Sequence, residues 1–155
     1  MGEWWHAICP RGMGMKVEQW MKRRVVTVRP RDSVRHAREL MEKDRINQLP
    51  VVVDGRLVGI ITDRDVRDAF PSVFASMEAP LRGRQGEPNP DAITVEEVMT
   101  PNVLTLAPGA SIVEVARLMK RERVGAVPIV ESDRLVGIIA RSDLLEALIA
   151  LAESR

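Results

Sequence analysis

An internal repeat constrains this chain more than any other feature of its sequence. Residues 17–70 align without a gap onto residues 95–148, at an offset of 78 positions, and 20 of the 54 aligned positions are identical. The segment at 56–61 recurs unchanged at 134–139. A unit this small rarely buries enough apolar surface to fold alone. We therefore expect two copies of one unit that pack on each other.

Each copy carries the same predicted elements in the same order. Strands are expected at 25–28, 49–53 and 57–61, and at 103–106, 127–131 and 135–139. The first helix of each copy begins after Ser33 or Ser111, a residue type that caps helices, and Ser111 with Glu114 forms a capping box. Asp54 and Gly55 predict a hairpin turn, and a last helix follows the third strand. The order β-α-β-β-α, repeated twice, predicts an α/β (α+β) fold.

The repeat also divides the chain into segments. We expect a disordered N-terminal arm at 1–14, a first repeat domain at 15–70, a linker at 71–92, a second repeat domain at 93–150 and a C-terminal tail at 151–155. The linker holds four of the ten prolines, which is typical of a mobile connection. Trp4 and Trp5 in the arm are either loosely packed tail residues or an anchor on a partner subunit.

The composition excludes several classes of protein. The single cysteine, Cys9, excludes a disulfide framework and a cysteine-cluster metal site, and it favours a reducing cytoplasm. His6 and His36 are isolated histidines with no second histidine nearby, and no metal site is predicted. No apolar run approaches the roughly 18 residues of a membrane helix, and no secretory signal is expected at the start. The chain pairs no nucleophile with a base, so we predict no enzyme.

Three segments of each copy resemble the motifs of the CBS domain, named after cystathionine β-synthase. They lie at 21–30, 45–52 and 57–65 in the first copy, and the resemblance covers about 108 of the 155 residues. It implies a tandem CBS pair with pseudo-two-fold symmetry, whose units pack through their sheets. Such pairs commonly bind adenine nucleotides or related adenosyl ligands in two clefts between the copies. They usually report a ligand level to a partner without being enzymes, and they often dimerise.

A first ligand site is predicted around Thr62, Arg64 and Asp65. A carboxylate can accept hydrogen bonds from both ribose hydroxyls of an adenosine phosphate, and an arginine can fork onto its phosphate. The resemblance implies that the base lies against the other copy, near Leu104, Val124, Gly125, Ala126 and Val127. The alternative is structural, because Thr-x-x-Asp is also a capping box that only starts a helix.

The second predicted site departs from this pattern. Asp143 remains, but Ala140 replaces the threonine and Ser142 replaces the arginine. The residues expected across the cleft from Asp143 are Val26, Ile46, Asn47 and Gln48. The loss of a hydroxyl and a cation weakens phosphate binding, although Ser142 and Asn47 can still bond a ribose. We expect unequal sites, with the Asp65 cleft the better one and the second cleft vacant or weak.

The leading hypothesis is a cytoplasmic, non-enzymatic sensor that works as a homodimer and signals to an unknown effector protein. Its regulatory ligand is AMP, ADP, ATP or S-adenosylmethionine, and no cofactor is required. The first alternative is a scaffold whose clefts bind nothing and whose output is protein association. The second alternative is nucleic-acid binding through the first copy, which has 12 basic and 9 acidic residues. It is less favoured because no aromatic residues are interleaved for base stacking.

Overall fold

The computed structural model describes residues 15–69 and 92–153, so the predicted arm and nearly all of the predicted linker lie outside the described residues. A one-turn 3-10 helix at Val17–Gln19 opens the described chain. The other elements are α1 (Val34–Asp44), β1 (Gln48–Val53), β2 (Arg56–Thr62), α2 (Asp63–Ala69), α3 (Val95–Val98), α4 (Ile112–Glu122), β3 (Ala126–Glu131), β4 (Arg134–Ala140) and α5 (Arg141–Glu153). The last helix thus runs into the segment predicted as a C-terminal tail. In the described part of the chain, no helix combines the length and apolar character needed to span a bilayer.

The two long helices that open the copies begin at the predicted caps. The Ser33 hydroxyl accepts from the backbone N–H of His36, which starts α1. At the start of α4, Ser111 and Glu114 form the expected capping box, with the Ser111 backbone N–H donating to the Glu114 carboxylate at 2.6 Å. These bonds satisfy backbone groups that a helix N-terminus leaves unpaired. Both predicted N-caps are confirmed.

The capping carboxylate at α4 makes stability depend on pH. The backbone N–H and the hydroxyl of Ser111 donate to Glu114 and hold the pKa of Glu114 below its ordinary value. A carboxylate whose pKa is lowered by folding adds stability above its ordinary pKa, and this contribution is lost as pH falls through the folded-state pKa.

We expect a Glu114→Gln variant to be less stable than the wild type at about pH 7, and this difference to shrink at about pH 3. The amide still accepts a hydrogen bond, so only the charge is removed. Urea denaturation at both pH values measures the difference, and the control is Glu146→Gln, at an exposed residue of α5. A difference that is equal at both pH values would show that the carboxylate charge does not stabilise the cap.

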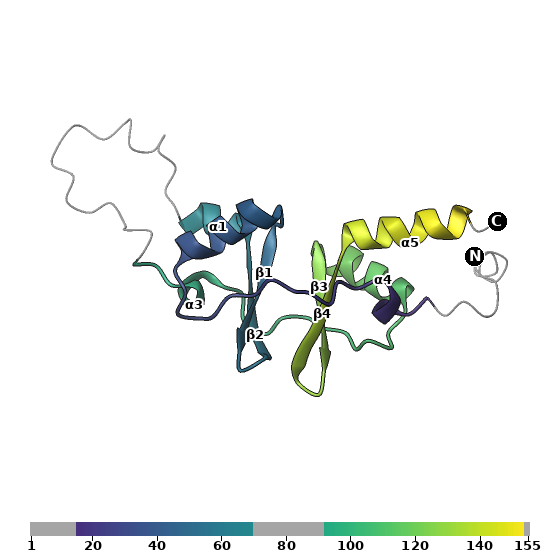
Figure 1. Cartoon of the computed structure of the whole chain (residues 1–155), viewed down its shortest axis with the longest axis horizontal. Coiled ribbons are helices and arrows are strands. Elements are labelled where there is room, and N and C mark those ends of the chain that lie inside the picture. The colour runs from purple at the N-terminus through teal and green to yellow at the C-terminus, as the bar shows by residue number, and fades with distance from the viewer. Residues whose placement is uncertain (1–14, 70–91, 154–155) are drawn as a thin grey trace.

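The strands form two antiparallel hairpins that meet side by side (Figure 1). The sheet order is β1-β2-β4-β3, and the hairpins pair with each other at Arg56 and Arg134. The predicted turn at Asp54 and Gly55 has φ values of 51° and 81°, and left-handed backbone at both positions gives the twist that a two-residue hairpin needs. The hairpins therefore bring the two copies into contact through their strands.

The strands predicted at 25–28 and 103–106 are not formed. Each segment contributes one isolated parallel bridge, Val28 to Val51 and Leu106 to Ile129. The Val28 N–H donates to the Pro50 carbonyl and the Val52 N–H donates to the Val28 carbonyl. The next ladder bond toward the N-terminus would need an N–H from Pro50, which proline lacks. Pro128 prevents the strand at 103–106 in the second copy for the same reason.

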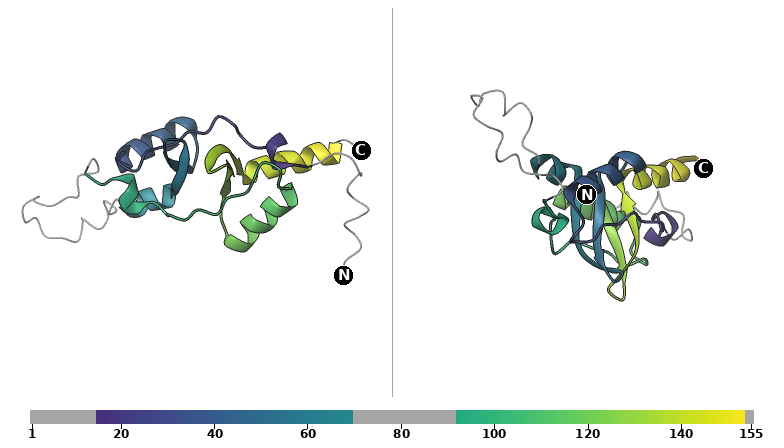
Figure 2. Two further views of the ribbon diagram at one scale, coloured as in Figure 1. Left: turned by 90° about the horizontal axis from the view of Figure 1, so that it is seen from below. Right: turned by 60° about the vertical axis from the view of Figure 1, so that its left-hand side comes forward.

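The segment that opens each copy in sequence packs on the other copy. The Val17 N–H donates to the Ala110 carbonyl at 2.9 Å, and the Ile112 N–H donates to the Met15 carbonyl at 2.9 Å. In the other direction, the Val95 N–H donates to the Asp32 carbonyl at 2.8 Å. Figures 1 and 2 show the purple N-terminal segment beside the second copy, and α3 beside the first. We call 15–24 and 93–102 the exchanged segments.

The exchange continues into the cores. Val95 is fully buried in the core of the first copy, with Leu49 and Ile61. Val17 is fully buried in the core of the second copy, with Ile139. Each core is therefore completed by residues that belong, in sequence, to the other copy. The exchange ties the two copies into one folding unit.

Candidate functional site

A cavity of about 430 Å³ lies between the two copies, where the strands of both hairpins meet their helices. Its volume is within the range of roughly 300–1,000 Å³ that is common for small-molecule sites. The first copy lines it with Lys22, Arg24, Val25, Val26, Arg45, Ile46, Asn47, Gln48 and Pro50, and the second copy with Gly125, Ala126, Ile138, Ala140, Arg141, Ser142 and Asp143. We call it the Asp143 cavity.

Asp143 is the buried carboxylate of this cavity, and its side chain is only 2% exposed. It lies in the first turn of α5, where the backbone N–H of Ala140 donates to its Oδ2 at 2.6 Å. Its Oδ1 lies 3.3 Å from Nζ of Lys22. A buried charge needs such partners. The cap orients the carboxylate, and the lysine neutralises it.

Lys22 reaches the cavity through the exchanged segment of the first copy. Its backbone N–H donates to the Ile138 carbonyl at 2.8 Å, and the Ile138 N–H donates back at 3.0 Å. These two bonds fix the Lys22 backbone on β4, within reach of Asp143. The lysine side chain is 61% exposed, so its ammonium is not packed in a core and is free to move.

The cavity is lined by four cationic side chains, Lys22, Arg24, Arg45 and Arg141, against the single carboxylate of Asp143. Arg45 is the left-handed C-cap residue of α1, with φ of 53°. Arg141 donates from Nη2 to the Val124 carbonyl at 3.1 Å. The excess of positive charge favours an anion in the cavity.

Gly125 and Gln48 close the cavity where β1 and β3 begin. A Cβ added to Gly125 would stand 3.3 Å from Nε2 of Gln48, so the glycine leaves room for this amide. The Gly125 carbonyl accepts from the backbone N–H of Arg141 at 3.1 Å. Every residue predicted for the second ligand site lines this one cavity. The structure thus brings that whole set together.

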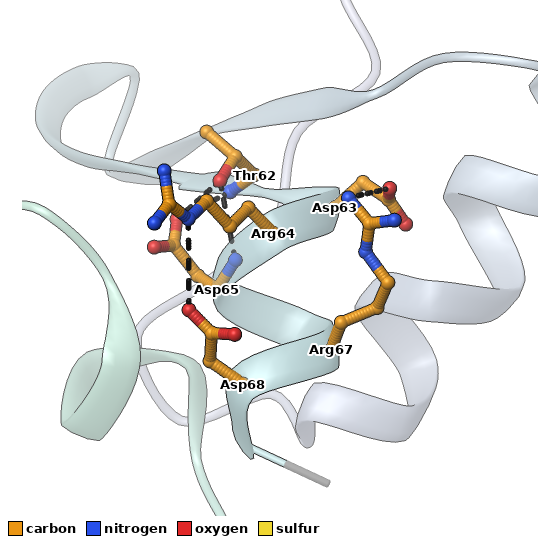
Figure 3. A network of polar contacts seen from close by, with 6 residues as sticks. All are labelled: Thr62, Asp63, Arg64, Asp65, Arg67 and Asp68. Atoms are coloured by element: carbon orange, nitrogen blue, oxygen red, sulfur yellow. Dashed lines mark hydrogen bonds and ion pairs between the residues drawn. The ribbon is translucent and has the colours of Figure 1, made fainter. Parts of the chain in front are cut away.

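The Asp65 site is arranged as a helix cap (Figure 3). The backbone N–H and the hydroxyl of Thr62 both donate to Oδ2 of Asp65, at 2.8 and 2.7 Å. The backbone N–H of Asp65 donates back to the Thr62 hydroxyl at 3.3 Å. Thr62 and Asp65 therefore form the capping box expected under the structural alternative. Oδ1 of Asp65 takes no part in these bonds.

The cation predicted for this site is engaged on the surface of α2. Nε of Arg64 lies 3.8 Å from Oδ2 of Asp68, and the Arg64 side chain is 85% exposed. Figure 3 shows this pair along the helix, with Arg67 and Asp63 paired on the other side. An exposed ion pair one turn apart is weak, so it does not prevent Arg64 from binding a ligand.

The other residues predicted for the Asp65 site are not gathered in one place. Gly125 and Ala126 line the Asp143 cavity. Val127 is fully buried in the second core, and its place beside the base stays a prediction. Leu104 is 45% exposed, and the Val124 carbonyl accepts from Arg141.

A larger hollow of about 990 Å³ lies beside the β1–β2 turn. It is lined by Thr27, Val28, Arg29, Pro30, Arg31, Asp32, Val52, Val53, Asp54, Gly55 and Glu96. None of the residues predicted for either ligand site lines it. Across residues 15–69 and 92–153, no group of three His, Cys, Asp or Glu side chains is placed to hold a metal ion. The Asp143 cavity is therefore the candidate functional site.

Sequence reasoning left Lys22, Arg24, Arg45 and Arg141 out of the site. Lys22 and Arg24 are among the 12 basic residues of the first copy, which the sequence connects only with the nucleic-acid alternative. Their position became clear only with the exchanged segment on β4. The alignment of the copies already shows a difference in charge at this position, since Lys22 stands where the second copy has Thr100.

The family model for the CBS domain matches residues 17–72 and 95–150. The chain belongs to the CBS domain family. A CBS domain-containing protein of Dictyostelium discoideum is 34% identical over 149 residues, which span 91% of this chain and 96% of that protein. The expected tandem CBS pair is confirmed.

Solved CBS-pair structures share this fold. The AMP complex of CBSX2, a CBS-pair protein of Arabidopsis thaliana, has a TM-score of 0.73 and 26% identity, and the match covers 90% of this chain and 99% of that one. The CBS domain pair of protein MJ0100, in complex with 5′-methylthioadenosine and S-adenosyl-L-methionine, has a TM-score of 0.69 and 29% identity, covering 86% and 98%. The α+β CBS-pair fold is confirmed.

Proposed function

We propose that this CBS pair is a regulatory module that binds an adenosyl ligand in the Asp143 cavity. The observation that carries the proposal is a buried carboxylate in a cavity that both copies line. CBS pairs of the same fold have been solved with AMP, and with 5′-methylthioadenosine and S-adenosyl-L-methionine. A ligand held by both copies stabilises one arrangement of the pair, by as much as its affinity differs between arrangements.

The side chains of the cavity suggest a role for each part of such a ligand. Asp143 would accept hydrogen bonds from the ribose hydroxyls, a charge-assisted contact. Lys22 and Arg24 would take a phosphate. Val26 and Ile46 would contact the base, with the small Gly125 opposite. We propose that this binding involves no chemical step and no cofactor.

We place the Asp65 cleft second, although the short motif alone favours it. In the motif, Ala140 and Ser142 stand where the first copy has a threonine and an arginine. The structure supplies cations to the Asp143 cavity from other elements, through Lys22 on the exchanged segment and Arg45 at the end of α1. We therefore propose that the Asp143 cavity binds more tightly and that Asp65 serves a weaker site.

Titration calorimetry with AMP tests the proposal. We expect Asp143→Asn to weaken AMP binding by about 10- to 100-fold, because it removes charged hydrogen bonds to ribose while keeping the size of the side chain. Asp65→Asn is the matched comparison, and we expect it to change the affinity of the tighter site by less than about threefold. If AMP, ADP, ATP and S-adenosylmethionine all fail to bind the wild type, the ligand role is excluded and the scaffold alternative is favoured.

We further propose that the module works as a homodimer in the cytoplasm and signals to an effector protein. The exposed face of α5 presents Leu145, Leu148 and Ile149, each between 55% and 61% exposed. Apolar side chains gathered on one helix commonly mark an interaction surface, and a second copy would present the same face. Light scattering at several protein concentrations measures the mass in solution, and a mass of one chain at all of them contradicts the dimer.

A further inference from the structure

We propose that the Asp143 cavity selects adenosyl ligands that carry a phosphate over neutral or positively charged ones, and that Lys22 sets this selectivity. The inference rests on the proposed function and names the ligand class of that site. Lys22 is a specificity-determining residue in this view, whereas Asp143 recognises the ribose that all adenosyl ligands share.

The Lys22–Asp143 pair places a cation beside the ribose-binding carboxylate. Oδ2 of Asp143 is held by the Ala140 backbone, and Oδ1 lies 3.3 Å from the lysine Nζ. A ribose hydroxyl that bonds Oδ1 must therefore approach this ammonium. The 5′ substituent of the same ribose then extends within reach of a flexible, exposed lysine. The ammonium can transfer from the carboxylate to a phosphate, so that no charge is left without a partner.

The other charges around the cavity act in the same direction. Arg24, Arg45 and Arg141 also line it, and Asp143 is its one acidic lining residue. A phosphate monoester carries about −1.5 to −2 charge at pH 7. It would gain from these cations, whereas a sulfonium would be repelled and a neutral thioether would gain nothing.

The two copies differ at most of these positions, so the positive charge is not a feature that every CBS repeat carries. The residues at the 78-position offset from Lys22, Arg24 and Arg141 are Thr100, Asn102 and Asp63. Arg45 alone among the four cations is matched by a cation, Arg123. Three of the four cations that line the Asp143 cavity thus have no cationic counterpart in the other copy, and the exchanged segment provides two of the four.

The test is calorimetric titration of the full chain with three ligands: AMP, neutral 5′-methylthioadenosine and the S-adenosylmethionine cation. We expect AMP to bind the wild type at least about tenfold more tightly than either of the others. Lys22→Gln should weaken AMP by about tenfold and change 5′-methylthioadenosine by less than about twofold. Arg23→Gln is the control, since it removes the same charge one residue away, and Arg23 does not line the cavity.

The outcomes separate this inference from the proposed function. If 5′-methylthioadenosine binds as tightly as AMP, and both depend on Asp143, the ligand role stands and the selectivity is overturned. An equal loss for all three ligands in Lys22→Gln, or an equal loss of AMP affinity in Arg23→Gln, also overturns the role of Lys22. If none of the three ligands binds, the proposed function itself fails.

Discussion

We expect an Ile139→Ala variant to lose about 2–5 kcal/mol of unfolding free energy. Ile139 lies on β4 and is fully buried in the second core, which also holds Val17, Val127 and Ile129. Truncation removes apolar contacts and leaves a cavity that a close-packed core fills only in part. The upper end of this loss equals the whole stability of a marginally stable domain, which is about 5 kcal/mol.

The repeat supplies matched variants for this measurement. Ile61 stands at the equivalent position of the first copy and is also fully buried, so Ile61→Ala should cost a similar amount. Val58 on β2 is 37% exposed, and Val58→Ala should cost much less. Urea denaturation gives all three values. A loss below about 1 kcal/mol for Ile139→Ala would mean that this core is not packed as described.

Local elements could be predicted because their causes are local. Ser33 and Ser111 cap the helices that follow them, and Asp54 with Gly55 forms the hairpin turn, since each arrangement depends on residues only a few positions apart. Because the two copies align without a gap, the elements predicted for the first copy also predict those of the second. The absent strand at 25–28 depends instead on Pro50, which lies more distant in the chain, in the strand that this segment would join.

The exchanged segments could not be predicted from the sequence. Val17 and Met21 are buried in the second core, and the sequence does not show which core receives them, because both copies offer the same strands and helices. The choice is made by tertiary contacts, such as the bond from Val17 to the Ala110 carbonyl. The composition of the candidate site depends on that choice, because it decides which cleft receives Lys22. The fold was therefore easier to predict than the site.

We expect a Val17→Asp variant to lose several kcal/mol of stability, because it buries a charge with no partner. The decisive readout is where that loss appears. Val17 belongs to the first copy in sequence but packs in the second core. Amide hydrogen exchange should therefore show lost protection in β3 and β4 before β1 and β2, since local opening follows the disrupted core.

Val95→Asp is the reciprocal variant, because Val95 is the repeat equivalent of Val17 and is also fully buried. Its loss of protection should appear first in β1 and β2, since Val95 packs in the first core. The milder Val17→Ala and Val95→Ala keep the comparison measurable if the charged variants do not fold. Loss in the copy to which each valine belongs in sequence would contradict the exchange.

The same pair of variants tests how the exchange supports ligand binding. Lys22 lies five residues after Val17 on the same exchanged segment, and its backbone is bonded to β4 through Ile138. Loosening Val17 should therefore displace Lys22 and lower the affinity for AMP, whereas Val95 anchors the segment that carries Thr100. Val17→Ala should weaken AMP binding more than Val95→Ala at equal loss of stability. The anchoring of an exchanged segment in the other core would then be the physical link between folding and ligand binding.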